Sequence, residues 1–367
     1  MPYDLNVAFL PSSKEFLSNK ILTRQERDNC NEPFIKLRSF AKTQGININT
    51  YDIFEKHEVI DILILTRYEV NLLKIFRILR KNKNAKIILL ITEELSVAPL
   101  GSKAFTNTGL FDKVLTWRPE DLDSKKYIHY FYPNPLRIYK SPINFESKKF
   151  ITIINSFKRN TFNTPTNLYE FRIEMINFFS DNSSIDLYGF GWNKCKSLSP
   201  NVKYCGQVTD KIEILYKYKY ALIIENSSDE AGAISEKIFD AFSAGCVPIY
   251  LGAPDISLYI PENTYINFKH FKNNYLLLNF LERLSRYQYL NYQNEIQKFM
   301  NSKSYKSFTS EAFAKKIVNL IKKLKLPGNE KSIALIKVQL LKNLFKDFFL
   351  HLKYKRLFVD TFLVLFI

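Results

Sequence analysis

The sequence predicts an α/β fold with two doubly wound, Rossmann-like domains, and three observations predict it. Short apolar runs bounded by polar turns alternate with helical patterns, the alternation occurs twice, and a proline-rich stretch separates the two series. Strands and helices that alternate in this way form parallel sheets covered by helices. The chain of 367 residues, 46% hydrophobic and 24% charged, is long enough for two such domains. We expect a ligand to bind in the cleft between them.

The N-terminal domain is expected to span residues 1–145. Its apolar runs and helical spacings predict these elements: strands at 5–10, 59–65, 85–91 and 111–117, and a helix at 71–81. Three prolines interrupt the stretch 130–144, which is therefore interpreted as a linker.

The C-terminal domain is expected to span residues 146–328. Its pattern predicts these elements: strands at 150–155, 185–190, 221–225 and 247–251, and helices at 168–179, 211–217 and 235–244. From 272 to 326 the pattern becomes helical and basic, and Pro327-Gly328 then ends it.

Residues 329–367 form a third segment, an amphipathic basic tail. Residues 330–367 hold seven Lys or Arg against three acids, and apolar residues recur there at steps of three and four. A helix with an apolar face and many basic residues is typical of an interfacial membrane anchor. We therefore expect a cytoplasmic protein that this tail holds at the inner face of the membrane. The alternative is a terminal helix packed on the body of the protein.

Composition narrows the possible classes of protein. The 53 Lys and Arg against 36 Asp and Glu give a net charge of +17, which favours anionic partners such as nucleotide phosphates, nucleic acid or acidic lipid. No nucleic-acid-binding module is recognised. The four cysteines are widely spaced, with no CxxC pair, so neither a zinc site nor a disulfide framework is indicated and a reducing compartment is expected. The N-terminus lacks the pattern of a secretory signal peptide, and no apolar stretch reaches the ~20 residues that span a bilayer.

The segment from residue 218 to 268 carries the most chemical information. A buried strand is expected to end in the polar pair Glu225-Asn226, and Ser235 suits the N-cap of the next helix. The end of a strand and the start of the following helix form the common phosphate site of open α/β sheets, because main-chain N–H groups and the positive end of the helix dipole meet there. Lys237 adds a full positive charge at the same place.

Glu236 lies beside Lys237 and is stabilised by the same helix dipole. Its carboxylate suits the hydroxyls of a sugar or a ribose, and an ordinary acid of the first helical turn is an equal alternative. Gly245 is in the position expected for the glycine that ends a helix. Gly252 is expected where another group packs closely against the backbone, and neither glycine is assigned a chemical role. The pattern alone therefore indicates a nucleotide or phosphate site.

Three stretches between residues 218 and 268 carry a family resemblance: K-Y-A-L-I-I-E-N-S, then I-S-E-K-I-F-D-A-F-S-A-G-C-V-P-I-Y-L-G-A-P, and then I-P-E-N-T-Y-I-N-F. Together they resemble the C-terminal half of the α1,3/4-fucosyltransferases, glycosyltransferase family 10. Members of that family are inverting enzymes with a two-domain GT-B architecture that transfer L-fucose from GDP-fucose to a GlcNAc or Glc unit of an acceptor glycan. The resemblance implies this fold and this activity, with an expected α1,3 linkage and a role in bacterial surface polysaccharide or lipopolysaccharide synthesis.

Carried over residue by residue, the resemblance implies a donor site in the C-terminal domain. Glu236 and Lys237 would hold the donor, with Lys237 on its diphosphate. Glu225 and Asn226 would line the same pocket.

Upstream, Arg172 lies in the stretch Y-E-F-R-I-E-M-I-N-F-F, which is similar to the arginine helix of the family. The resemblance implies that this arginine contacts the donor diphosphate, and a planar guanidinium suits two phosphate oxygens. Lys158 and Arg159 are a basic alternative, and an exposed helical charge is the structural alternative for Arg172.

Inversion at an anomeric carbon needs a carboxylate in the acceptor domain, which takes the proton from the incoming hydroxyl. In the family this base follows the last strand of the N-terminal domain, and here the strand expected at 85–91 is followed by Glu93 and Glu94. The family has a proline two residues after the glutamate, whereas this chain has Ser96 two residues after Glu94. Glu94 is the first choice for the base and Glu93 the second, and a solvated loop acid is the alternative for both.

No metal or cofactor is expected to be required, and a divalent cation would at most stimulate turnover. No DxD pair of acids follows a strand in the way that a metal-dependent GT-A site requires, and two cations with a helix N-terminus can hold a diphosphate. Ala233 stands where the family commonly has an aromatic residue, which affects the choice of sugar or base. The expected partners are a nucleotide sugar, a glycan or glycolipid acceptor and the membrane surface, but no nucleic acid. The alternatives are a GT-B transferase for another nucleotide sugar and a non-catalytic glycan-binding relative.

Overall fold

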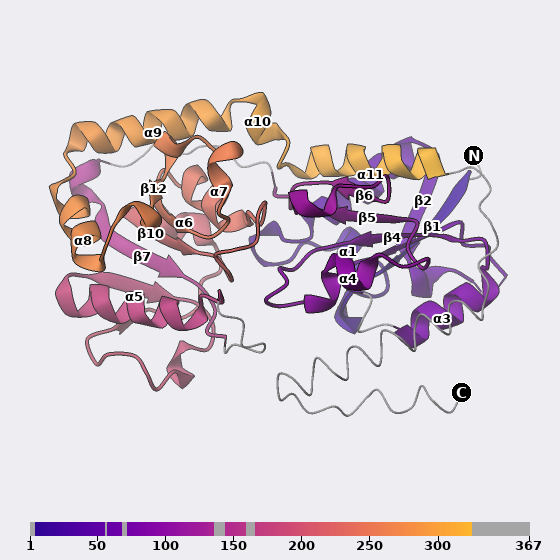
Figure 1. The fold of residues 1–367 in the computed structure, drawn as a ribbon, viewed down its shortest axis with the longest axis horizontal. Coiled ribbons are helices and arrows are strands. Elements are labelled where there is room, and N and C mark those ends of the chain that lie inside the picture. Colours follow the sequence, from indigo (N-terminus) through magenta and orange to yellow (C-terminus); the bar gives the residue numbers. More distant parts are fainter. Residues whose placement is uncertain (1–3, 56, 68–71, 136–143, 159–165, 325–367) are drawn as a thin grey trace. The chain divides into compact units, whose positions relative to one another are not determined.

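Two sheets of six parallel strands organise the chain in the computed structural model (Figure 1). The structure describes the following residues: 4–55, 57–67, 72–135, 144–158 and 166–324. These residues divide into two compact units, each with its own sheet. Of the described residues, the first unit contains those of 4–133 together with 310–324, and the second contains 134–135, 144–158 and 166–309.

The sheet of the first unit has the strand order β2-β1-β3-β4-β5-β6. Its strands are β1 (Leu5–Leu10), β2 (Ile46–Thr50), β3 (Ile62–Leu65), β4 (Lys86–Leu90), β5 (Lys113–Thr116) and β6 (Tyr127–His129). Every residue of β3 is buried, as is typical of an inner strand in a parallel sheet. The strands expected near 5–10, 85–91 and 111–117 are confirmed, and the strand expected at 59–65 is the shorter β3.

The helices of the first unit are α1 (Lys20–Thr23), α2 (Glu32–Thr43), α3 (Leu72–Lys81), α4 (Lys103–Thr106) and α11 (Ser310–Leu324). The sequence predicts α3 but not α2, β2 or β6. The edge strand β2 reads I-N-I-N-T, so asparagines interrupt its apolar run, and β6 has only three residues. Strands β5 and β6 follow β4 along the chain and extend the same sheet, so the strand before Glu93 is not the last of its domain, unlike the arrangement given for the family.

Helix α11 packs against α2 in the first unit, although the sequence boundaries place it in the domain 146–328. The ring of Phe313 lies 6.0 Å from that of Phe34, and the ammonium of Lys36 lies 3.1 Å from the carboxylate of Glu311. The apolar face of α11 is readable from the helical spacing, but that spacing does not show which helix covers the face.

The sheet of the second unit has the strand order β12-β11-β10-β7-β8-β9. Its strands are β7 (Lys149–Ile154), β8 (Ile185–Tyr188), β9 (Lys203–Tyr204), β10 (Tyr218–Ile224), β11 (Val247–Leu251) and β12 (Ile266–Asn267). The chain order reverses between β7 and β10, where the two strands pair in parallel. In doubly wound sheets, ligands bind at the carboxyl ends of the strands beside such a switch point.

The helices of the second unit are α5 (Tyr169–Asn182), α6 (Lys211–Leu215), α7 (Glu236–Ser243), α8 (Asn274–Arg283), α9 (Arg286–Met300) and α10 (Lys303–Lys306). The expected helices at 168–179, 211–217 and 235–244 are confirmed as α5, α6 and α7, and the expected strands at 150–155, 185–190, 221–225 and 247–251 as β7, β8, β10 and β11. The described part of the expected linker, residues 130–135, contains an isolated bridge at Asn134 but no strand or helix.

The buried side chain of Lys148 forms hydrogen bonds at the C-terminal end of α7. The ammonium of Lys148 donates hydrogen bonds to the main-chain oxygens of Tyr216 at 2.8 Å, Tyr218 at 3.1 Å and Gly245 at 3.0 Å. Burial lowers the pKa of Lys148. Gly245 follows α7 with a φ of +58°, so the expected glycine at the helix C-cap is confirmed. These contacts tie the starts of β7 and β10 to the helix whose other end carries the candidate site.

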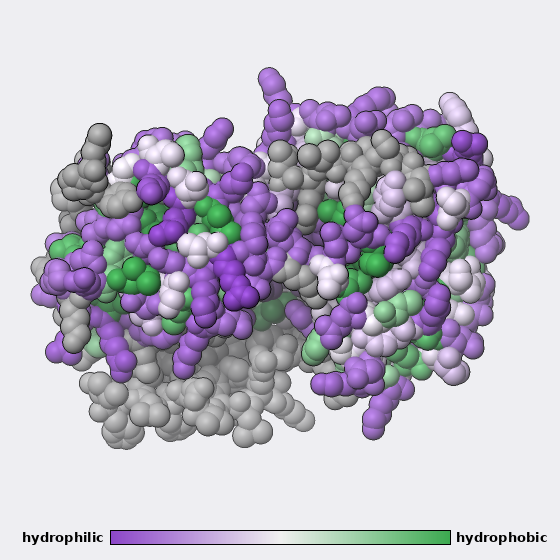
Figure 2. Space-filling model, turned by 180° about the vertical axis from the view of Figure 1, so that it is seen from behind, coloured by the Kyte–Doolittle hydropathy of each residue, from purple (hydrophilic) through white to green (hydrophobic). Residues whose placement is uncertain are grey.

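Charged and polar side chains cover most of the face shown in Figure 2, and hydrophobic side chains are scattered among them. Among the described residues, no helix has the length and apolar character needed to cross a bilayer. The tail 329–367, for which membrane anchoring is expected, lies outside the described residues.

Candidate functional site

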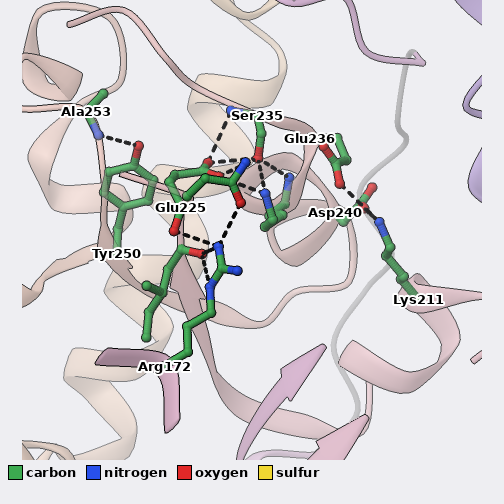
Figure 3. Close-up of polar contacts among 11 residues, drawn as sticks. Arg172, Lys211, Glu225, Ser235, Glu236, Asp240, Tyr250 and Ala253 are labelled. Atoms are coloured by element: carbon green, nitrogen blue, oxygen red, sulfur yellow. Dashed lines mark hydrogen bonds and ion pairs between the residues drawn. The ribbon is translucent and has the colours of Figure 1, made fainter. Parts of the chain in front are cut away.

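Arg172 on α5 contacts the end of β10 at the switch point of the second sheet (Figure 3). Its Nε and Nη2 atoms donate to the main-chain oxygen of Ile224 at 3.2 and 2.8 Å. Nη2 also donates to the main-chain oxygen of Glu225 at 2.6 Å and to Oδ1 of Asn226 at 3.0 Å. The residue is only 3% exposed, and its guanidinium lies over the ring of Tyr169 at 4.9 Å. Arg172 thus holds the end of β10 by hydrogen bonds to its main chain and places a positive charge next to it.

Glu225, the first residue after β10, is fully buried and joins this strand to the start of α7. Its carboxylate accepts hydrogen bonds from the Ser235 hydroxyl, at 2.8 and 2.9 Å, and from the Ser235 main-chain N–H at 3.2 Å. The ammonium of Lys237 donates to Oε2 of Glu225 at 2.7 Å and to Oγ of Ser235 at 2.9 Å. The Ser235 hydroxyl also accepts from the main-chain N–H of Lys237, which confirms Ser235 as the N-cap of α7.

Lys237 keeps its positive charge in this buried network. Burial by itself would lower the pKa of Lys237, but the charges of Glu225 and Glu236 raise it above its ordinary value and outweigh the nearby Arg172. The side chain of Lys237 is 19% exposed, whereas Arg172 is only 3% exposed. Arg172, Lys237 and the start of α7 bring positive charge to this end of the sheet, and the carboxylates of Glu225 and Glu236 offset part of it.

Glu236 points away from this network and pairs with a residue of another helix (Figure 3). Its Oε1 lies 3.1 Å from the ammonium of Lys211, the first residue of α6, which also lies 3.6 Å from Oδ2 of Asp240. Burial would raise the pKa of Glu236, but the charges of Lys211 and Lys237 lower it well below its ordinary value. The side chain is 33% exposed, so an ionised carboxylate lies near the surface beside the ammonium of Lys211.

Gly252, just after β11, forms one wall of the site. A Cβ atom at this position would lie 2.5 Å from Cγ of Glu225 and 2.5 Å from the hydroxyl oxygen of Tyr250. The Tyr250 hydroxyl accepts the main-chain N–H of Ala253 at 3.0 Å and is held there. The close approach of backbone expected at Gly252 is confirmed, and it closes the space around Glu225.

Glu93 and Glu94, the candidate bases, follow β4 in the first unit. The main-chain oxygen of Glu94 accepts the N–H of Ala98 at 2.8 Å, so a tight turn begins there. Arg118 donates to the main-chain oxygen of Gly101 at 2.6 Å and holds the far end of the same loop. Glu94 is 7% exposed, whereas Glu93 is half-buried. The assignment of either residue as the base stays a prediction.

The second unit brings Arg172, Glu225, Asn226 and Lys237 into one polar network, as their predicted role in one pocket requires. Their role in donor binding stays a prediction, and in this structure Glu225 and Asn226 bind protein groups. Sequence reasoning missed Lys211. The only signal for it was the N-cap acid Asp210, whose carboxylate accepts from the main-chain N–H groups of the first turn of α6. Within the described residues, no cluster of three or more His, Cys, Asp or Glu side chains forms a metal site.

Residues 158–338 match the family model described as glycosyltransferase family 10 (fucosyltransferase), C-terminal region. An α-(1,3)-fucosyltransferase of Helicobacter pylori is 32% identical over 96 residues, which are 26% of this chain and 19% of that protein. An α-(1,4)-fucosyltransferase of Arabidopsis thaliana is 36% identical over 67 residues, 18% of this chain and 16% of that protein. Each match thus spans less than a fifth of the curated relative.

Solved structures with the same fold cover most of the chain. An α1,3-fucosyltransferase with GDP superposes with a TM-score of 0.53 and 15% identity, over 90% of this chain and 92% of that one. Anabaena Alr3699/HepE in complex with UDP and glucose gives a TM-score of 0.57 and 9% identity, over 87% of this chain and 99% of that one. At these identities the likeness establishes the GT-B fold alone. The family resemblance predicted from the sequence is confirmed, because residues 158–338 of this chain match the C-terminal region of glycosyltransferase family 10.

Proposed function

We propose that the chain is an inverting fucosyltransferase that moves L-fucose from GDP-fucose to a GlcNAc or Glc unit of a glycan, with α1,3 linkage. The observation that carries the proposal is the pair of cations at the switch point of the second sheet, Arg172 and Lys237, inside the region that matches the family model. The family description names fucosyltransferases, and solved α1,3-fucosyltransferases of similar fold contain GDP or GDP-fucose.

The donor half of the mechanism depends on stabilising the leaving GDP. The diphosphate gains negative charge as its bond to the sugar breaks, and fixed positive charges aimed at that place lower the barrier. Lys237, with its side chain 19% exposed, would contact a phosphate oxygen directly. Arg172, which is 3% exposed, would act through its charge beneath the end of β10. Because these cations and the start of α7 offset the charge of the diphosphate, we expect turnover to persist in EDTA.

The acceptor half requires a base. The carboxylate of Glu94 would take the proton from the acceptor hydroxyl while that oxygen bonds to the anomeric carbon, and the bond between this carbon and the GDP oxygen would break. Attack from the face opposite GDP inverts the configuration at the carbon. Glu93 is the second choice, and its half-buried side chain is the more accessible of the two.

Thermal shift measurements with GDP, UDP and GDP-fucose test the choice of donor. We expect GDP and GDP-fucose to raise the melting temperature, because a ligand that binds only the native state stabilises it by about 2.7 kcal/mol at a hundred times its Kd. UDP should leave the melting temperature unchanged. An equal shift with UDP would support a GT-B transferase for another nucleotide sugar.

Transfer of labelled fucose to a GlcNAc-containing oligosaccharide tests the reaction itself. Product with an inverted anomeric configuration, identified by NMR, supports the proposal. Donor binding without transfer to any GlcNAc or Glc acceptor would point instead to a non-catalytic glycan-binding relative.

We also propose that the tail 329–367 holds the enzyme at the inner face of a bacterial membrane, where acceptors for surface polysaccharide or lipopolysaccharide are assembled. The support is the tail's seven basic residues and its apolar helical spacing. Each basic residue near an anionic surface contributes about 1 kcal/mol, and salt weakens this attraction. The full chain should cosediment with anionic liposomes at low salt, and a version that ends at Gly328 should not. Equal pelleting of both versions would remove the support for the anchor.

A further inference from the structure

Lys211 is a half-buried cation for which the donor site described above gives no role. It begins α6, and the carboxylate of Asp210 fixes this helix start by accepting the N–H groups of Ile212 at 2.8 Å and Glu213 at 3.2 Å. The side chain of Lys211 is 16% exposed, and its ammonium lies between two carboxylates of α7 (Figure 3). Because the N-terminus of α6 is fixed by its cap, the ammonium of Lys211 is held next to the first two turns of α7.

The two carboxylates that Lys211 contacts repel each other. Glu236 and Asp240 are four residues apart on α7, so their side chains lie on the same face of the helix, and like charges at this spacing are destabilising. The side chain of Asp240 is only 2% exposed, so water screens its charge little. The ammonium of Lys211 lies 3.1 Å from Oε1 of Glu236 and 3.6 Å from Oδ2 of Asp240 and offsets both charges.

We propose that Lys211 is a positioning residue of the donor site, which fixes the Glu236 carboxylate where it accepts hydrogen bonds from hydroxyls of the bound nucleotide sugar. The inference rests on the proposed function and extends it to a residue of another helix. Glu236 directly precedes Lys237 in the first turn of α7, and its carboxylate lies close enough to that lysine for its charge to raise the pKa of Lys237. The side chain of Glu236 is also 33% exposed, so a ligand at this helix start can reach it. The charge of Lys211 also helps to lower the pKa of Glu236, so this carboxylate stays an acceptor of hydrogen bonds at neutral pH.

A double-mutant cycle on GDP affinity, measured by isothermal titration calorimetry, tests the proposal. The four proteins are the wild type, Lys211→Met, Glu236→Gln and the double variant, all as the full chain. We expect Lys211→Met and Glu236→Gln each to weaken GDP binding about tenfold, as for the loss of one charge-assisted hydrogen bond. The double variant should bind no more weakly than Glu236→Gln, because Lys211 acts through Glu236. Lys211→Arg should recover most of the affinity.

Two further variants separate positioning from folding. Lys217→Met removes an exposed lysine just after α6 and should bind GDP like the wild type. Lys211→Met/Asp240→Asn leaves no uncompensated charge at Asp240, so it keeps the fold even if Lys211→Met alone does not. It should still show the tenfold loss.

The outcomes distinguish the two proposals. Additive losses in the cycle, or unchanged affinity in the folded Lys211→Met/Asp240→Asn protein, would overturn the role of Lys211 while leaving the donor assignment intact. A wild-type protein that binds no GDP would overturn the proposed function, and the role of Lys211 with it.

Discussion

Replacement of Lys237 by methionine tests whether the ion pair with Glu225 is a buried structural contact as well as part of the donor site. The Glu225 carboxylate is fully buried, and the Lys237 ammonium lies 2.7 Å from its Oε2. Methionine keeps most of the volume of the lysine chain but removes the charge, so it leaves a buried carboxylate without its cation.

The magnitude follows from what remains around Glu225. Loss of one partner of a buried ion pair costs about 3–5 kcal/mol. Glu225 keeps its hydrogen bonds from the Ser235 hydroxyl at 2.8 Å and main-chain N–H at 3.2 Å, so we expect the lower end, about 3 kcal/mol. In a domain of this size that loss lowers the melting temperature by about 6–12 °C. GDP binding should also weaken about tenfold to a hundredfold, because the contact with the diphosphate is lost.

Differential scanning calorimetry measures the effect, with two further variants. Glu225→Gln/Lys237→Met carries neither charge of this ion pair and should recover at least half of the lost stability while still binding GDP poorly. Lys298→Met breaks an exposed pair with Glu295 and should cost less than about 1 kcal/mol. If Lys237→Met melts within 1 °C of the wild type, the burial argument for Glu225 is refuted.

Three other predictions concern the same chemistry. Gly252→Ala should lower stability by about 1–3 kcal/mol and weaken GDP binding, because its Cβ would press on Glu225; unchanged urea unfolding and GDP titration would contradict this. Since the pKa of Glu236 lies below its ordinary value of 4.5, its ion pairs contribute stability that is full above about pH 5 and is lost as the pH falls through the lowered pKa. Lys211→Met should therefore flatten the acid side of the stability profile in urea titrations between about pH 3 and 6, and an unchanged profile would show that Lys211 does not lower this pKa. Glu94→Gln should reduce turnover about a hundredfold or more without loss of GDP binding, and if Glu93→Gln alone shows that loss, Glu93 is the base.

Part of the candidate donor site could be found from local signals in the sequence. Ser235 is readable as an N-cap from the residues that follow it, and Lys237, two residues later, places a charge in the first helical turn. Arg172, Glu225 and Asn226 were predicted only from the family resemblance. The contacts that these residues make in the folded protein could not be predicted from the sequence. Glu225 contacts Ser235, which lies ten positions further along the chain, and its carboxylate binds protein groups where the sequence suggested a residue that lines a pocket.

The sequence by itself determined the alternation of strands and helices and the positions of the cations, because side-chain periodicity and helix capping depend on neighbours within a few residues. Only the tertiary structure decided which surfaces meet. The apolar face of α11 is covered by α2, from the opposite end of the chain, and Lys211 finds Glu236 25 residues away. An amphipathic pattern indicates that one face of a helix must be buried. A charged residue in the interior likewise indicates that an opposite charge must lie near it. The choice of partner depends on how the whole chain packs, because many other faces and charges in the same sequence satisfy the same local rule.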